Sequence, residues 1–522
     1  MSVNNLELEI FNNLLSTVAE EMGNVLIRSA YSPNIKERRD LSCAVFNSTG
    51  DMIAQAAHIP VHLGSMSFSV DAIKEMEIND GDIFVLNDPF QGGTHLPDIT
   101  CIKPVFFNNK FEFFAVSRAH HADIGGETPG SMPLSTSIHQ EGIIIPPSYL
   151  YKKGELNKKL IDEILSTTRN TEEREGDFKA QIACLEVGAR RLTDIVEKYG
   201  IEKITEASLK LLEYSERIMR AVIHDIPDGT YRFTDYLDDD GQGNENIKIR
   251  VSININGEEL DVDFRESSPA ITGCLNTPYS VTTSAVLYVF QCLAKDIPLN
   301  SGPLNVIKVI TDYNSILNAR YPAAVVGGNV ETSQRVVDTV FGALSHIIPE
   351  KIQAASAGTM SNVTFGGINP KTNTEYAYYE TIAGGMGGRL GKNGINAIQT
   401  HMTNTLNTPI EALERELPII INSYSIRKSS GGTGKHKGGN GIVREFKFLT
   451  NTEVTIITER RLNAPYGING GNPGAKGINF LITEKGKELL PPKKTFKVKP
   501  GNILRIETPG GGGWGKANGE KV

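Results

Sequence analysis

The chain has 522 residues, of which 39% are hydrophobic and 22% charged, and its formal net charge is −8. This composition is ordinary for a globular protein with a large core, and the length suggests about two to four domains. A chain with excess acid offers no extended basic surface, so we expect neither nucleic acid nor an anionic membrane as a partner.

The five cysteines are scattered and form no C-x-x-C pair, which argues against a zinc ribbon or a redox dithiol. Unpaired thiols are typical of a reducing compartment, so we expect a cytoplasmic protein. The first 30 residues carry several glutamates among their apolar side chains, unlike a secretory signal. No apolar run approaches the roughly 18 residues of a membrane span.

The first 121 residues predict a helix followed by strands, with a second helical stretch over residues 65–78. Apolar residues recur every three or four positions over residues 5–30, which predicts an amphipathic helix. Residues 40–60 alternate like a hairpin with its turn at residues 48–51. The stretch "GDIFVLNDP" predicts a buried strand that runs into a loop, and residues 103–121 predict a hairpin that turns at residues 108–109. Polar clusters therefore stand at strand ends, where a rigid sheet positions functional loops.

The rest of the chain predicts helices, then strands, then a mixed segment. Residues 157–224 are strongly helical, residues 230–265 return to strand, and residues 277–297 predict a largely buried helix. A glycine-rich turn leads into another helix near residue 330, which Thr332 or Ser333 is able to cap. The last hundred residues predict strands joined by glycine-rich loops.

These elements predict an α+β fold. We expect a large mixed multi-sheet architecture with a helical middle segment and a β-rich, glycine-rich C-terminal part. Four regions follow from the pattern: an α/β region with the metal site over residues 1–150, a helical region over 151–230, a central α+β region over 231–425 and a β-rich region over 426–522. No linker separates them, so we expect them to be intertwined.

Two polar stretches stand out: "NDPFQGGTHLPDIT" at residues 87–100 and "AHHADIGG" at residues 119–126. His95 and Asp98 are three residues apart, and a proline bends the chain between them, so both side chains can enter one cavity. Neighbours on a strand point to opposite faces, so only one of His120 and His121 is expected to face that cavity, and Asp123 shares the face of His121.

Imidazole nitrogens and carboxylate oxygens suit zinc, manganese or iron, so these groups predict a divalent metal site. Asp40, near a strand start, is able to complete the ligand set. The alternative is a buried hydrogen-bond network in which the glycines serve turns.

Other polar groups carry weaker patterns. His58 and His62 are either outer supports of that site or structural histidines. Asn329 and Glu331 stand near a helix N-terminus and are able to contact substrate or merely to cap the helix. Residues 238–240 are three aspartates that lack the EF-hand ligand pattern, which favours a turn over a calcium loop. The stretch "GGTGKHKGG" lacks Walker spacing, so we expect no P-loop for ATP here.

Taken together, the motifs resemble those of a known family. "NIKERRDLSCAVF", "NDPFQGGTHLPDIT", "SRAHHADIGGETPGSMP", "GNVETSQRVVD" and "ETPGGGGWG" occur in the order found in the hydantoinase B/oxoprolinase family. That family includes the B-type subunit of N-methylhydantoinase, the C-terminal half of 5-oxoprolinase and the alpha subunits of acetone-type carboxylases. The chain length is most similar to that of a free-standing hydantoinase B protein.

The resemblance implies a hetero-oligomer with a hydantoinase A type subunit that binds ATP. That partner phosphorylates the carbonyl oxygen of a small cyclic amide or a ketone, and the B-type subunit completes the reaction at a divalent metal. By the same resemblance the metal ligands are Asp40, His95, Asp98 and either His120 or His121. Asp123 is expected to act as a base or to orient a ligand histidine.

Four functions remain as alternatives. The first is a B-type subunit of an ATP-dependent cyclic amidohydrolase that opens a lactam or imide ring. The second is a subunit of an ATP-dependent ketone carboxylase of the acetone carboxylase type, which incorporation of bicarbonate would reveal. The others are a non-catalytic scaffold for the A-type subunit and a metallohydrolase that acts without partner or ATP.

Overall fold

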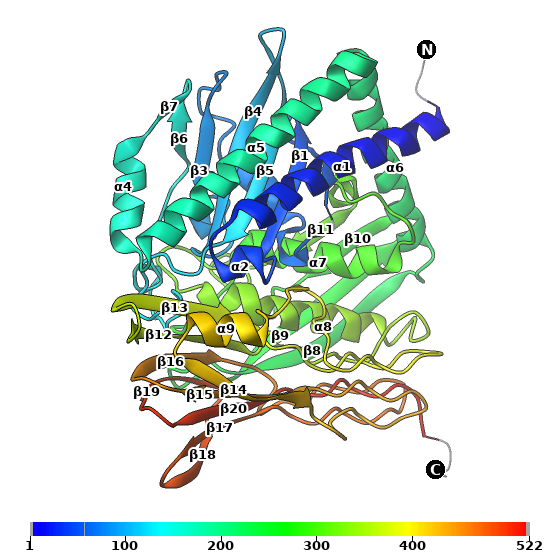
Figure 1. The fold of residues 1–522 in the computed structure, drawn as a ribbon. Coiled ribbons are helices and arrows are strands. Elements are labelled where there is room, and N and C mark those ends of the chain that lie inside the picture. Colours follow the sequence, from blue (N-terminus) through cyan, green and yellow to red (C-terminus); the bar gives the residue numbers. More distant parts are fainter. Residues whose placement is uncertain (1–3, 57, 518–522) are drawn as a thin grey trace.

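The computed structural model describes residues 4–56 and 58–517. Residues 1–3, 57 and 518–522, which fall within the first and last regions expected from the sequence, lie outside the described residues. The described residues form four β-sheets that are stacked in layers with helices on and between them (Figure 1). This arrangement confirms the α+β class.

The first layer is a seven-stranded sheet in the order β2-β1-β5-β4-β3-β6-β7. Both predicted hairpins are present, and Asn108 and Asn109 make the second turn with φ of 50° and 63°. The strands are β1 (Leu41–Asn47), β2 (Met52–Gln55), β3 (Ile83–Leu86), β4 (Asp98–Phe107), β5 (Lys110–His120), β6 (Ser148–Lys152) and β7 (Glu155–Leu156).

Long helices cover one face of this sheet (Figure 1). The first of them begins with a capping box, in which the Asn4 side chain accepts from the backbone N–H of Glu7 and the Glu7 side chain accepts from that of Asn4. The helices of this layer are α1 (Asn5–Ser29), α2 (Pro33–Lys36), α3 (Ser65–Asp71), α4 (Lys158–Thr167), α5 (Thr171–Tyr199) and α6 (Ile201–His224), and the short 3-10 turns are η1 (Pro60–His62), η2 (Pro89–Gln91) and η3 (Ile138–Gln140).

The sheet is buried on both faces. Cys43 and Val45 of β1 join the core beneath α1 and α5, whereas Ala44 and Phe46 join the core on the opposite side. Alternate side chains of one strand therefore enter two different cores, which explains why "LSCAVF" reads as one apolar run.

The second layer is a four-stranded sheet in the order β11-β10-β9-β8, with two helices packed on it. The prediction that Thr332 or Ser333 caps the second helix is wrong, because a π-helical turn, η5 (Gly328–Thr332), runs directly into it. The elements are β8 (Gly229–Asp239), β9 (Glu245–Asn256), β10 (Glu259–Asp263), α7 (Tyr279–Leu293), η4 (Gly302–Asn305), β11 (Ile307–Ile310) and α8 (Ser333–Leu344).

Two further sheets enclose a third core of large apolar side chains such as Phe365 and Phe446. Their strand orders are β13-β12-β16-β19 and β14-β15-β20-β17-β18. The elements are β12 (Asn362–Asn369), β13 (Thr374–Glu380), α9 (Ile410–Glu416), β14 (Ile419–Ile426), β15 (Ile442–Phe448), β16 (Thr452–Ile457), β17 (Ile478–Thr483), β18 (Gly486–Leu490), β19 (Lys493–Val498) and β20 (Ile503–Glu507).

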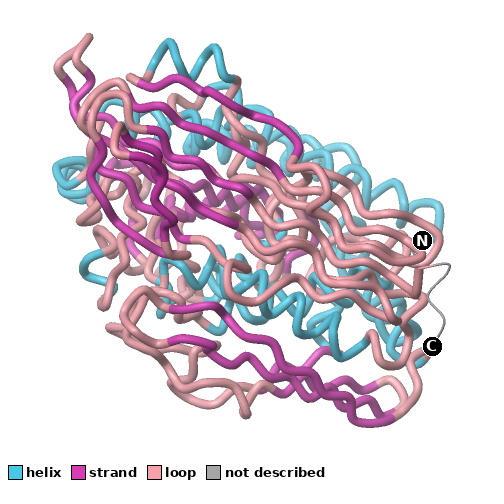
Figure 2. The backbone as a smooth tube through the Cα atoms, turned by 90° about the horizontal axis from the view of Figure 1, so that it is seen from below, coloured by secondary structure: helices cyan, strands magenta, loops and turns pink. Residues whose placement is uncertain are grey.

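The glycine-rich loops of the C-terminal part run side by side as extended segments outside the sheets (Figure 2). They are joined through backbone hydrogen bonds, for example from Gly511 N to Gly439 O at 2.9 Å and from Gly512 N to Ala355 O at 2.8 Å. An added Cβ at Gly438 would collide with the Gly511 carbonyl, and one at Gly510 with the Ser430 carbonyl. Glycine is therefore required by the close approach of neighbouring backbones.

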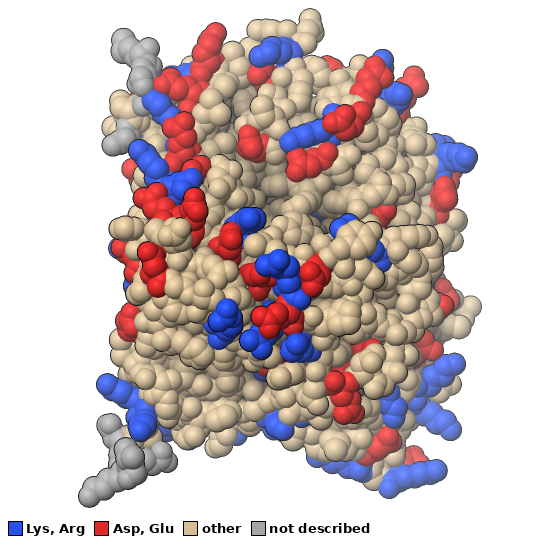
Figure 3. All heavy atoms as spheres, turned by 180° about the vertical axis from the view of Figure 1, so that it is seen from behind, with Lys and Arg blue, Asp and Glu red and all other residues tan. Residues whose placement is uncertain are grey.

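Several other expectations can be compared with the structure. All five cysteines are described, and none forms a disulfide. The turn expected near residue 240 is present, because the Asp240 carboxylate accepts from the backbone N–H of Gln242 and Asn244. Among the described residues, no helix has the length and apolar character needed to cross a membrane. On the face shown in Figure 3, basic and acidic side chains of the described residues are interspersed.

Candidate metal centre

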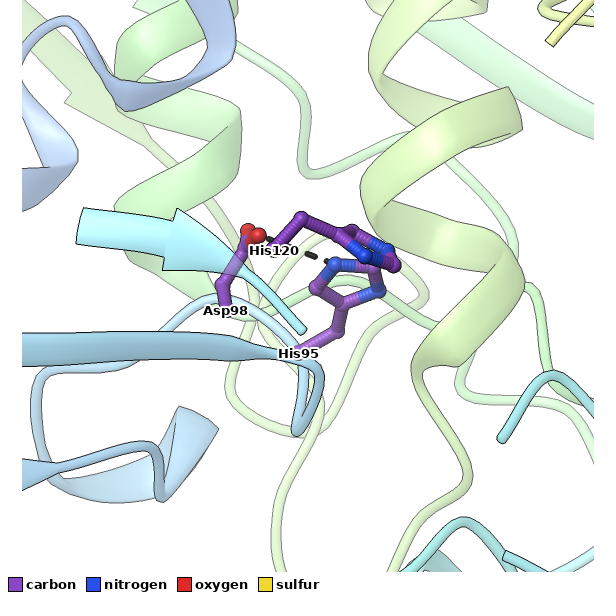
Figure 4. Close-up of side chains that lie close together, drawn as sticks. All are labelled: His95, Asp98 and His120. Atoms are coloured by element: carbon purple, nitrogen blue, oxygen red, sulfur yellow. Dashed lines mark ion pairs between the residues drawn. The ribbon is translucent and has the colours of Figure 1, made fainter. Parts of the chain in front are cut away.

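The pairing of β4 with β5 brings the two polar stretches together. Asp98 is the first residue of β4 and His120 the last of β5, and the two are direct cross-strand partners. Direct partners in an antiparallel pair project to the same face, so both side chains lie at one edge of the sheet. His95 lies in the loop just before β4, and its carbonyl accepts from Asp98 N at 3.0 Å. Figure 4 shows the three side chains pointing toward one another.

The loop that carries His95 is held by Asn87. The Asn87 amide donates to the carbonyls of Leu96 at 2.9 Å and Ile143 at 3.0 Å, and its oxygen accepts from Ile145 N. Gly93 packs so closely on this turn that an added Cβ would collide with the Asn87 carbonyl. The Gly-Gly pair in the motif thus serves the tight return of the loop, which delivers His95 to the strand end.

The three side chains are buried and converge. One ligand atom from each of His95, Asp98 and His120 lies within 4.8 Å of the others. His95 Nε2 is 3.3 Å from Asp98 Oδ2, and the two imidazole ring centroids are 5.0 Å apart. None of the three is more than 2% exposed, so bulk water is excluded from the cluster.

Asp98 is the anionic centre of this cluster. Its Oδ2 accepts from Thr94 Oγ1 at 2.7 Å and from Asn329 Nδ2 at 3.3 Å, and His62 Nε2 lies 3.4 Å away. Burial opposes ionisation, but the charges of His95 and His62 outweigh it and hold the pKa of Asp98 well below its usual range. The carboxylate is therefore ionised near neutral pH.

His120 is held from two sides. Its Nδ1 lies 3.2 Å from the Asn34 amide nitrogen, and its ring stacks on Tyr379 with centroids 4.8 Å apart. The Tyr379 hydroxyl donates to Asn362 Oδ1 at 2.9 Å, which fixes the ring behind His120. Burial lowers the pKa of His120 well below its usual value, and the nearby His95 adds to this effect. A neutral imidazole keeps a lone pair for a metal.

The donor set fits a divalent metal. Both ring nitrogens of His95 and Nε2 of His120 are buried without a hydrogen-bond partner among the described residues. Unsatisfied buried nitrogens are rare in a structural network, because each costs free energy unless something binds it. Two imidazoles and one carboxylate are a ligand set for zinc, manganese or iron that leaves coordination positions open.

Asp40 lies beside the cluster but outside the converging group. Its carbonyl accepts from His120 N at 3.0 Å, and its carboxylate is 3.8 Å from Arg38 Nη2. Burial raises the pKa of Asp40 to about 6, against the opposing charge of Arg38, and Asp98 raises it further. Asp40 is thus near enough to Asp98 for their charges to interact, whereas the convergent group found among the described residues consists of His95, Asp98 and His120.

His121 and Asp123 lie on the opposite face. His121 Nε2 is 2.9 Å from Gln181 Oε1, and its ring packs on Phe178 of α5. Asp123 accepts from the backbone N–H of Gly125 and Gly130 and forms an ion pair with Arg169 at 2.9 Å. Both oxygens of Asp123 are occupied, so the carboxylate organises its own loop and gives no support to the expected role as a base.

The two residues expected to contact substrate have different surroundings. Asn329 reaches Asp98, and its Oδ1 is buried without a partner among the described residues. Glu331 points elsewhere: its Oε1 accepts from Thr359, Met360 N and Asn362. Burial raises the pKa of Glu331 to about 8, and Glu459 contributes to this shift. Glu331 therefore anchors Asn362, which in turn orients Tyr379.

Some residues of the site were not singled out by the sequence. Tyr379 reaches His120 from a distant segment and belongs to no recognisable spacing. Asn34 begins the stretch "NIKERRDLSCAVF" that carries the family resemblance, but nothing in that stretch pointed to its contact with His120. Glu141 is buried, and burial raises its pKa to about 7, with Ser135 and the charge of His95 among the groups that lower it. Its Oε1 accepts from Ser135 and the N–H groups of residues 325 and 326, whereas Oε2 has no partner among the described residues.

His58 and His62 have different roles. His62 Nδ1 lies 2.8 Å from Ser42 Oγ, and its other nitrogen faces Asp98, so His62 supports the cluster from outside. His58 instead accepts from Cys43 N at 3.2 Å, and burial lowers its pKa to about 4. The position of His58 is that of a structural histidine.

Several known proteins are similar in sequence to this chain over nearly its whole length. The family model for hydantoinase B/oxoprolinase matches residues 4–517. An uncharacterised protein of Methanocaldococcus jannaschii is 43% identical over 98% of this chain and 90% of its own length. 5-Oxoprolinase 1 of Arabidopsis thaliana is 39% identical over 98% of this chain, which spans 42% of that longer protein. The putative B-type subunit of a D-/L-hydantoinase from a Pseudomonas strain is 31% identical over 96% of this chain and 88% of its own length.

Solved structures share the fold. The ATP-dependent caprolactamase of Pseudomonas jessenii matches 99% of this chain and 92% of its own, with a TM-score of 0.91 and 28% identity. A nucleotide-free acetone carboxylase matches 97% of this chain and 76% of its own, with a TM-score of 0.85, and at 19% identity it shows the fold alone. With the family model matching almost every described residue, the chain belongs to the hydantoinase B/oxoprolinase family.

Proposed function

We propose that this chain is the B-type subunit of an ATP-dependent cyclic amidohydrolase, which opens a lactam or imide ring after a hydantoinase A type partner has phosphorylated it. The observation that carries the proposal is the buried convergence of His95, Asp98 and His120. The names of two similar proteins support it: one is the putative B-type subunit of a hydantoinase, and a structural neighbour is an ATP-dependent caprolactamase. The lack of a Walker motif agrees with ATP binding by the partner.

The chemistry explains why two subunits are needed. Amide resonance makes a lactam a poor electrophile, and phosphorylation of its carbonyl oxygen gives the ring carbon a good leaving group. His95, Asp98 and His120 would hold a divalent metal, which supplies a Lewis acid and lowers the pKa of water toward about 7. The absence of bulk water around these side chains protects an activated intermediate from side reactions.

The chain's own groups position the reactants. The polar neighbours of Asp98 stabilise its negative charge. One of them is Asn329, whose Nδ2 donates to Asp98 and whose Oδ1 has no partner among the described residues. That oxygen is able to accept a hydrogen bond from a ring N–H or from water. Glu141 has a free oxygen and a pKa raised to about 7 by burial, so it is suited to exchange a proton at neutral pH.

The test is reconstitution with an A-type partner. The complex is incubated with ATP and 5-oxoproline, hydantoins or simple lactams, and ring-opened product is measured by mass spectrometry. ATP-dependent ring opening by the complex, and by neither protein alone, is the expected result. Carbon-14 bicarbonate in a parallel reaction with ketones separates the carboxylase alternative. Incorporated label without ring opening, or ring opening without ATP and partner, would overturn the proposal.

A further inference from the structure

A cavity of about 470 Å³ opens between α7, α8 and residues 395–404. We name it the Arg389 pocket; its lining includes Pro60, Lys351, Arg389, Gln399 and His401. Its volume is within the range of small-molecule sites. Because the metal-centre side chains are buried, a substrate needs a recognition site nearer the surface, and this pocket is a candidate.

The charge of the Arg389 pocket is one-sided. Lys351 and Arg389 are exposed at its wall, and no Asp or Glu occurs among the described residues that line it. Neither cation has an ion pair or a side-chain hydrogen bond with another described residue, and both bond only through their backbone. Unpaired cations facing a cavity without acid favour an anionic occupant.

His401 adds a buried polar group to the pocket wall. It is 3% exposed, and both of its ring nitrogens lack a hydrogen-bond partner among the described residues. Its Nε2 lies 3.3 Å from Asp338 Oδ1, and Asp338 is itself paired with Arg460 at 2.5 Å. Asp338 thus anchors the ring through Nε2, whereas the buried Nδ1 has no partner among the described residues and remains able to bond a ligand.

A chain of hydrogen bonds connects the wall of the Arg389 pocket to the metal centre. Gln399 of the pocket wall donates to Thr381 Oγ1 at 3.0 Å, and Arg38 donates to the same oxygen at 3.2 Å. Arg38 also donates to Asn34 Oδ1 at 3.3 Å, and the Asn34 amide nitrogen is 3.2 Å from His120 Nδ1. On the other side, Pro60 lines the pocket, and His62 of the same η1 turn faces Asp98 at 3.4 Å.

We infer that the Arg389 pocket binds a small oxyanion on its way to or from the metal centre. The inference rests on the proposed function, which supplies two such groups: the phosphate of the activated ring and the carboxylate of the opened product. Lys351 and Arg389 provide the charge, and His401 provides a hydrogen bond at the buried end. The shared chemistry of both ligands is a compact anionic oxygen group.

The experiment measures binding without turnover. The full-length chain, metal-free and metal-loaded, is titrated calorimetrically at constant ionic strength with inorganic phosphate and with 5-aminopentanoate, the opened form of a simple lactam. Arg389→Gln, Lys351→Gln and His401→Asn are compared with Lys485→Gln, a control at an exposed lysine in the β17–β18 turn. Circular dichroism melts confirm that each variant is folded.

We expect saturable binding of at least one anion, weakened about tenfold by Arg389→Gln and by Lys351→Gln and unchanged by Lys485→Gln, because each cation makes a charge-assisted contact. The anion that binds identifies the source. Absence of saturable binding would overturn the inference, as would binding that requires metal and is indifferent to Arg389. Loss of association with the A-type partner in Arg389→Gln, without anion binding by the wild type, would assign the pocket to a protein contact instead.

This outcome is separable from that of the proposed function. Anion binding is measured on the single chain without ATP, partner or ring opening. A chain that binds phosphate at Arg389 but supports no ring opening would refute the proposed function and keep the anion site. A chain that supports ring opening but binds neither anion would refute the anion site and keep the proposed function.

Discussion

Asp98→Asn removes the one negative charge of the candidate metal centre while keeping the shape of the side chain. Oδ2 of Asp98 accepts from Thr94 at 2.7 Å and from Asn329 at 3.3 Å. Hydrogen bonds to a charged group contribute about 1 kcal/mol more than neutral ones, so the variant loses about 2 kcal/mol of folding free energy from these two contacts. Loss of an anionic ligand should weaken metal binding by at least about 100-fold, or about 2.7 kcal/mol.

The assay compares three proteins after removal of metal with a chelator and reloading with zinc, manganese or iron. Metal content is measured by mass spectrometry, and affinity by competition with a coloured chelator. His121→Gln is the matched control, because His121 is also buried but faces Gln181. We expect about one metal per chain in the wild type and the control, as in other sites built from two imidazoles and a carboxylate, and little in Asp98→Asn. Equal metal affinity in all three proteins would refute the reasoning.

Three more predictions concern stability and support of the site. Burial raises the pKa of Glu141 from 4.5 to about 7, so between these pH values the folded chain keeps a proton that the unfolded chain has lost. The protonated Glu141 therefore contributes to stability in full below about pH 4.5, and this contribution is lost as the pH rises to 7. Between pH 5 and pH 8, the free energy of urea unfolding of the wild type should fall by up to about 3 kcal/mol relative to that of Glu141→Gln. Stabilities of the two proteins that change in parallel with pH would contradict this. Tyr379→Phe keeps the ring on His120 but loses the hydrogen bond to Asn362, so metal affinity measured by chelator competition should fall about tenfold. An unchanged affinity would remove Tyr379 from the support of the site. Gly438→Ala should lower the free energy of unfolding by more than about 4 kcal/mol or prevent folding, because the added Cβ collides with the neighbouring backbone. Gly391→Ala has open space around its Cβ and should cost only about 1–2 kcal/mol, because alanine disfavours the left-handed backbone there. Similar unfolding curves for the two variants would disprove the packing argument.

The local part of the fold and site was predictable from short-range patterns. Strand alternation placed the turn at residues 108–109, and the same alternation implied that only one of His120 and His121 faces His95. The proximity of Asp98 and His95 was predictable from their spacing, because a separation of three residues that includes a proline restricts the backbone between them. These predictions depend only on neighbouring residues, whose relative directions are set by backbone geometry.

The remaining features depend on contacts between distant segments. Tyr379 backs His120 from β13, and Asn329 reaches Asp98 from a π-helical turn that no pattern indicated. Asp123 shared a motif with the site, yet Arg169 pairs with it on the far face. Pairwise spacing carries no information on such partners, because they are chosen by how sheets and helices pack.

The most direct test of the account is the ratio of ring-opened product to ADP formed by the complex with its A-type partner. In the proposed mechanism, ring opening depends on His95, Asp98 and His120 of this chain, and phosphorylation on the partner. With wild-type chain we predict a ratio near one, at about one ATP per ring. With Asp98→Asn we predict that ADP continues to form while opened product falls by at least about 100-fold, consistent with loss of the metal. An unchanged ratio in the variant would contradict the account, because ring opening would then not depend on this centre.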